Sequence, residues 1–124
     1  QFRHLAELAH EACQRHRLPS ALVELSLPGE PKAGQAEFER VVLGAVRSGD
    51  FVMEPTRAYP ALVVLLPLAG ERGTDIFIDR CSQFCRRNGI ADEAMRVARV
   101  DLSTTESAAD ALRELADSKG ARGA

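Results

Sequence analysis

The sequence has few aromatic residues: its 124 residues include no tryptophan, one tyrosine and five phenylalanines. Proteins that bind single-stranded nucleic acid commonly stack the bases on several exposed aromatic side chains. A chain with so few aromatic rings is poorly suited to that task. The composition therefore argues against a sheet surface that stacks single-stranded RNA or DNA.

The chain also lacks an excess of either charge, since 16 Lys and Arg residues stand against 18 Asp and Glu residues, for a net charge of −2. This balance gives no general affinity for nucleic acid or for an anionic membrane surface. We therefore expect no DNA or RNA partner, and any anion site must be built locally. No apolar run approaches the roughly 20 residues that cross a bilayer, and no signal peptide is visible. Because the helical pattern already begins at Gln1, we expect a domain excised from a longer protein.

Cysteine is scarce as well, with three residues at positions 13, 81 and 85. Cys81 and Cys85 are four residues apart in a predicted helix, so they share one face of it. A structural zinc site needs a second pair of ligands at short spacing, and the sequence offers none. We interpret the thiols as reduced core residues, and we predict no metal ion and no cofactor.

Hydrophobic periodicity predicts four helices and four strands. The predicted helices are 1–17, 35–47, 74–88 and 106–117, and the predicted strands are 21–27, 51–54, 61–66 and 95–102. The third strand is the most apolar segment, which indicates a central strand buried on both faces. The order α–β–α–β–β–α–β–α predicts an α+β sandwich of the split βαβ type, with helices on a mostly antiparallel sheet. We expect one domain over residues 1–118 and a flexible tail over residues 119–124.

The helix predicted over 74–88 is the most clearly patterned of the four. Thr74 or Asp75 should lie near its start, and Gly89 should end it in a left-handed conformation. Arg80 falls outside the apolar stripe of this helix. The stripe that we expect to be buried consists of Ile76, Phe77, Cys81, Phe84 and Cys85.

A charged turn, Arg47-Ser48-Gly49-Asp50, separates two apolar runs. Its position predicts Arg47 at the end of a helix and Asp50 just before a strand. An arginine presents a fixed fork of donors and an aspartate presents two acceptor oxygens, and guanine offers O6 and N7 as acceptors with N1–H and its amine as donors. The alternative is structural, with an arginine that caps the helix and an aspartate that caps the turn.

The order of the elements, with three short motifs, resembles the GGDEF family of diguanylate cyclases over most of the chain. Residues 15–23 are similar to the family's junction between first helix and first strand, and residues 62–67 to the strand that ends in Leu-Pro. Residues 46–50 are similar to its RxxD product-inhibition site, the I-site. The following helix then carries Arg80 where the family has a further arginine of that site. The resemblance implies a GGDEF-like sandwich fold.

The catalytic motifs of that family are missing. Residues 58–62 read Ala-Tyr-Pro-Ala-Leu in place of the Gly-Gly-Asp/Glu-Glu-Phe hairpin, and residues 25–28 read Leu-Ser-Leu-Pro in place of an Asp-x-Asp motif. In the family, the glycines let the backbone approach the substrate phosphates, and the carboxylates serve the metal and catalysis. Phosphoryl transfer from GTP depends on metal ions that neutralise the developing charge. The departures therefore imply a domain that is not an enzyme and has no catalytic or metal-binding residues.

Degenerate GGDEF domains of this kind serve as cyclic di-GMP receptors, in Pel polysaccharide regulation and in bacterial cellulose secretion. The resemblance implies a cyclic di-GMP site made of Arg47, Ser48, Gly49, Asp50 and Arg80. It also implies control of exopolysaccharide biosynthesis or secretion, and so of biofilm, by a cytoplasmic domain of a bacterial inner-membrane protein. In this family the ligand often enters as a stacked pair, which could bridge to a neighbouring domain or a membrane secretion complex. The rival hypothesis is a structural or protein-docking GGDEF-like domain that binds no nucleotide.

Overall fold

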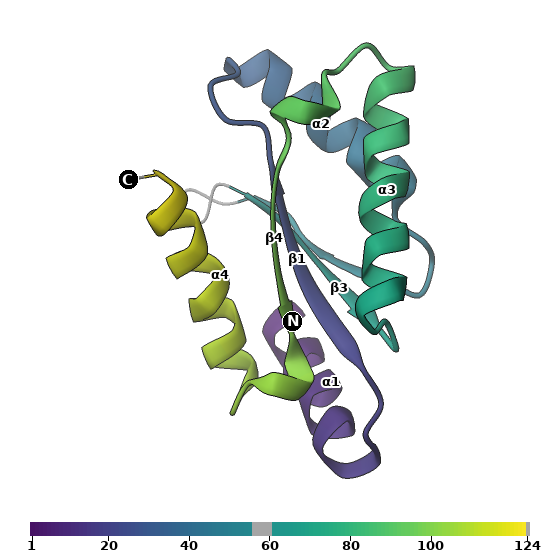
Figure 1. The fold of residues 1–124 in the computed structure, drawn as a ribbon, viewed down its shortest axis with the longest axis vertical. Coiled ribbons are helices and arrows are strands. Elements are labelled where there is room, and N and C mark those ends of the chain that lie inside the picture. The colour runs from purple at the N-terminus through teal and green to yellow at the C-terminus, as the bar shows by residue number, and fades with distance from the viewer. Residues whose placement is uncertain (56–60, 124) are drawn as a thin grey trace.

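The computed structural model describes residues 1–55 and 61–123, the last six of them as backbone only (Figure 1). Its helices and strands follow the predicted order, with two short 3-10 helices added. Residues 56–60, which connect the second and third predicted strands, lie outside the described residues. The bounds are α1 (Phe2–His16), β1 (Ser20–Ser26), α2 (Lys32–Ala45), β2 (Phe51–Met53), β3 (Leu62–Pro67), α3 (Glu71–Arg87), η1 (Asp92–Ala94), β4 (Arg96–Asp101), η2 (Leu102–Thr104) and α4 (Ala108–Gly123).

The four strands form one sheet in the order β2-β3-β1-β4, and every neighbouring pair is antiparallel. Strand β3 pairs with both β1 and β2, so it lies between the two strands that α2 connects. Strand β1 in turn lies between β3 and β4, which α3 connects. This arrangement is the split βαβ sandwich, and it confirms the fold class predicted from the sequence.

Two helical layers cover the sheet, with α2 and α3 on one face and α1 and α4 on the other (Figure 1). A hydrophobic core lies on each face of the sheet, and side chains of β1 and β3 enter both of these cores. On β3, Val64 packs with α2 and α3, whereas Val63 packs with α1 and α4. Strand β3 is therefore apolar along its length, as expected for a strand covered on both faces, whereas β1 also contains the buried polar residues Ser20 and Glu24. Among the described residues, no helix is long and apolar enough to cross a membrane.

Helix α2 is displaced toward the N-terminus relative to the predicted range 35–47. It begins at Lys32, directly after Pro31, whose carbonyl accepts the first helical hydrogen bond from the Gln35 amide at 3.0 Å. A proline before a helix loses no internal hydrogen bond, so Pro31 does not prevent the helix from beginning three residues earlier than predicted. The helix ends at Ala45, and Arg47 consequently lies in the following turn and not in the helix.

Helix α3 begins earlier than predicted, at Glu71, with Gly70 as its N-cap residue. The prediction that Thr74 or Asp75 lies at the start was wrong, because the Thr74 hydroxyl donates inside the helix to the Gly70 carbonyl at 2.8 Å. The predicted left-handed stop is confirmed, since Gly89 has a φ of 75°. The early start adds a turn to the helix just beyond the end of β3.

The predicted buried stripe of α3 is correct except at one position. Phe77, Cys81 and Cys85 are buried and Phe84 packs against the same core, but Ile76 is 49% exposed. Helix α4 also differs from its predicted range of 106–117, since its backbone is helical from Ala108 to Gly123. The flexibility of the tail over residues 119–124 stays a prediction.

All three cysteines are free and buried, as predicted. Burial raises the pKa of each thiol, and it raises the pKa of Cys81 to about 12, with a smaller contribution from the neighbouring Cys85. A thiol with a raised pKa and little exposure has almost no reactive thiolate at neutral pH. No group of three or more potential metal ligands occurs among the described residues.

We predict that Cys81 reacts slowly with a disulfide-exchange reagent at pH 8 in the native state and rapidly after unfolding. Because the unfolded thiol ionises near its ordinary pKa of 9.0, the unfolded state should gain stability relative to the native state as the pH rises above 9. Urea titrations between pH 8 and 10 should therefore show a falling free energy of unfolding, with a shallower fall in Cys81→Ala. Rapid labelling of the native protein would contradict the buried assignment.

Candidate functional site

Three of the predicted site residues, Arg47, Asp50 and Arg80, line a single pocket of about 240 Å³. The first two lie in the turn between α2 and β2, and Arg80 lies on α3. The end of β3 and the loop that follows it complete the walls. The fold therefore brings together residues that are 33 positions apart in the sequence.

The turn from Arg47 to Asp50 is closed by two hydrogen bonds. The Asp50 amide donates to the Arg47 carbonyl at 3.0 Å, and the Arg47 amide donates to Oδ2 of Asp50 at 3.0 Å. The structural role that the sequence allowed for Asp50, that of a turn cap, is therefore present. Within the described part of the chain, its second oxygen, Oδ1, has no hydrogen bond, which leaves it available to a ligand. Ser48 and Gly49 form the exposed tip of the turn and do not line the pocket.

Arg80 is held in place by two contacts. Its Nε donates to the carbonyl of Ala45 at 2.8 Å, which satisfies one of the free carbonyls at the end of α2. Its guanidinium lies over the ring of Phe77, 5.5 Å from the ring centre, as a cation–π contact. These contacts fix the plane of the fork, and the two terminal nitrogens have no hydrogen bond within the described residues. They can therefore donate to a phosphate or to a base.

The charge in this pocket is positive, although the chain as a whole carries −2. Two arginines, Arg47 and Arg80, and one carboxylate, that of Asp50, line the pocket, and no ion pair joins these three side chains among the described residues. Arg47 is exposed at the surface, whereas Asp50 and Arg80 are half-buried. A chain with a net negative charge can bind an anion only where positive side chains gather, and this pocket is such a place.

The rim of the pocket is apolar, which the sequence did not indicate. Leu68 is 66% exposed and Ile76 is 49% exposed, and both line the pocket. Leu68 also has a φ of 62°, in the left-handed region that costs a residue with a side chain about 1–2 kcal/mol. No sequence signal marks this conformation, because glycine or asparagine is the usual occupant.

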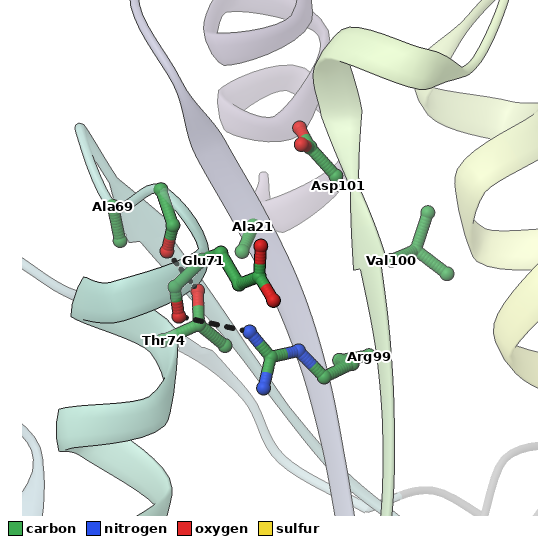
Figure 2. Close-up of a pocket in the computed structure, with 8 residues that line it drawn as sticks. Ala21, Ala69, Glu71, Thr74, Arg99, Val100 and Asp101 are labelled. Atoms are coloured by element: carbon green, nitrogen blue, oxygen red, sulfur yellow. Dashed lines mark hydrogen bonds between the residues drawn. The ribbon is translucent and has the colours of Figure 1, made fainter.

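A larger hollow of about 400 Å³ lies between the start of β1, the start of α3 and the end of β4 (Figure 2). Its one arginine is Arg99, which donates to the Asp75 carboxylate and, at 3.0 Å, to the Glu71 carbonyl. The charge of Arg99 is therefore already balanced within the protein. This hollow is less suited to an anionic ligand than the pocket around Arg80.

No protein-family model and no curated protein sequence matches the chain. Solved structures do match it. PelD of Pseudomonas aeruginosa PA14, residues 156–455 in complex with c-di-GMP, aligns with a TM-score of 0.71 and 20% identity over 85% of this chain and 40% of that one. The apo form of the same protein gives a TM-score of 0.67 at 21% identity, over 85% of this chain and 40% of that one. PelD of strain PAO1 in complex with c-di-GMP gives 0.70 at 20% identity, over 85% of this chain and 39% of that one.

These likenesses show the fold: the chain has the architecture of one part of PelD. The chain spans about 40% of the PelD chains that it matches. At this level of identity the ligand and the partners of PelD remain properties of PelD.

We predict that Asp50→Ala lowers the free energy of unfolding by about 1 kcal/mol, because the Arg47 amide loses its acceptor. Gly49→Ala is the matched control in the same turn. Gly49 has no left-handed φ, and a Cβ added there meets nothing within 4 Å. Its effect should stay within about 0.5 kcal/mol. Equal stabilities of the two variants in urea titrations would show that the carboxylate does not hold the turn.

Proposed function

We propose that this chain is a non-catalytic cyclic di-GMP receptor domain, a degenerate GGDEF-like module of the PelD type. The observation that carries the proposal is the pocket that Arg47, Asp50 and Arg80 line together. The sequence motif selected these three residues as a ligand site independently of their position in space. The c-di-GMP in the matching PelD complexes supports this choice of ligand.

Each of the three side chains has chemistry that suits this ligand. The terminal nitrogens of Arg80 and the guanidinium of Arg47 can donate to a phosphate or to O6 and N7 of guanine. Oδ1 of Asp50 can accept from N1–H and the amine of the same base. Ser48 and Gly49, at the tip of the turn, complete the proposed site.

The size of the pocket bears on how the ligand sits. A site that encloses a drug-sized molecule usually measures about 300–1,000 Å³, whereas this pocket measures about 240 Å³. We infer that one guanine and its phosphate enter, while the rest of the dinucleotide lies outside. A second ligand molecule stacked on the first, or a neighbouring domain, would then cover the exposed part.

In the parent protein, we propose that this domain is cytoplasmic and regulates exopolysaccharide biosynthesis or secretion at a bacterial inner membrane, and so biofilm formation. The assignment as a receptor and not an enzyme rests on the missing hairpin glycines and carboxylates at residues 58–62 and 25–28. The likeness to PelD supports the Pel-type assignment over the cellulose-secretion one, which rests on the sequence motif alone.

The second candidate is a structural or docking domain that binds no nucleotide. The bonds already made by two of the residues favour it: Asp50 caps its own turn and Arg80 binds the end of α2. Both residues would then be explained by folding alone. Binding measurements distinguish the two candidates, because only the first requires an interaction with cyclic di-GMP.

We predict that the domain binds cyclic di-GMP in isothermal titration calorimetry, and that Arg47→Ala and Arg80→Ala each weaken binding at least about tenfold. Each change removes a charge-assisted hydrogen bond, commonly about 1.5–3 kcal/mol. Arg113→Ala is the matched control, since Arg113 pairs with Asp110 on α4, on the opposite face of the sheet. Absence of heat with the wild-type domain would favour the docking candidate.

We predict that Asp50→Asn weakens cyclic di-GMP binding at least about tenfold while leaving the stability close to wild type. The asparagine side-chain carbonyl can still accept from the Arg47 amide, but the side-chain NH2 group would then face the guanine donors and could not accept from them. The wild-type domain should also prefer cyclic di-GMP to cyclic di-AMP at least about tenfold, because adenine lacks the two donors that pair with a carboxylate. Equal affinity for both dinucleotides would show that Asp50 does not read the base.

A further inference from the structure

We infer that Leu68 and Ile76 form an apolar platform that holds the flat face of the guanine base. The inference rests on the proposed function and names two further binding residues in the same pocket. Asp50 would read the edge of the base, and the platform would hold its face.

The first observation is where exposed apolar side chains occur. The described residues include six large hydrophobic side chains that are exposed, and two of them, Leu68 and Ile76, line this one pocket. They come from separate elements, the loop after β3 and the second turn of α3. Both therefore lie beside Arg47, Asp50 and Arg80, on the surface where a ligand would enter.

The second observation is the backbone of Leu68. This residue adopts a left-handed conformation at a position where glycine would be free of strain. The conformation is held by the buried hydroxyl of Ser20, which accepts from the Leu68 amide at 3.2 Å. A strained residue that keeps a large side chain and exposes it fits a role in binding better than a role in folding.

The chemistry of the pocket matches a purine base. A purine has an apolar face and a polar edge, and the pocket pairs an apolar rim with a carboxylate and two guanidinium groups. A base covered by Leu68 and Ile76 would exclude water from its contacts with Asp50, and those hydrogen bonds become stronger away from water.

The test combines affinity and stability measurements on Leu68→Gly, Ile76→Ala and the control Leu8→Ala. Leu8 is 50% exposed on α1, which packs on the other face of the sheet. We expect the first two variants to weaken cyclic di-GMP binding at least about fivefold by calorimetry, and the control to bind like wild type. The melting temperature of Leu68→Gly should equal or exceed that of wild type, because the left-handed strain is relieved.

Each other outcome has a defined meaning. If wild type binds but Leu68→Gly and Ile76→Ala bind equally well, the platform is wrong and the proposed receptor function stands. If wild type does not bind cyclic di-GMP, both the receptor function and the platform are wrong. If Leu68→Gly melts well below wild type, Leu68 has a structural role, and the affinities of Ile76→Ala and Leu68→Met then decide the question. The platform requires that Ile76→Ala weakens binding and that the affinity of Leu68→Met stays within about twofold of wild type.

Discussion

The pairing of β3 with β2 is the constraint on which the site depends. In this register Phe51 lies opposite Leu65. Since antiparallel partners move in opposite directions along the chain, the residues just before Phe51 must lie beside those just after Leu65. The turn that contains Arg47 and Asp50 is therefore placed against the end of β3 and the loop of Leu68. A register shifted by one residue would turn every side chain of this short edge strand to the other face and separate the turn from that loop.

The hydrogen bond from Arg80 to the Ala45 carbonyl closes the other side of the pocket. It joins α3 to the end of α2 on the face of the sheet that both helices cover. The same side chain thus joins two helices and lines the pocket that Asp50 also lines. A structural role and a binding role are compatible here, because the two roles use different nitrogens of one guanidinium group.

The sequence was sufficient to predict the sheet and the turn of Arg47 and Asp50, since both depend on local patterns, whereas the ligand-binding role of these residues stays a prediction. Continuous apolar residues marked the central strand, and the charged residues between two apolar runs marked the turn at residues 47–50. The start of α3 at Glu71 and the exposure of Ile76 were not predictable in this way. They depend on where β3 ends against its neighbours, which is a tertiary property. The left-handed Leu68 was also missed, because a buried hydroxyl 48 positions earlier in the chain holds its backbone.

The difference between the two arginine-containing hollows explains why the smaller one is the better candidate site. Arg99 donates to Asp75 and to the Glu71 carbonyl, so an anion would have to compete with a carboxylate that is already bound. Arg80 instead binds a neutral carbonyl, and Asp50 accepts from a backbone amide. Arg80 and Asp50 therefore do not neutralise each other in an ion pair. Their hydrogen bonds nevertheless hold both side chains in place before a ligand binds. A ligand that carries an anionic group and paired donors can contact Arg80 and Asp50 without breaking an ion pair, and little entropy is lost in ordering these side chains. A small, open pocket can bind tightly under these conditions.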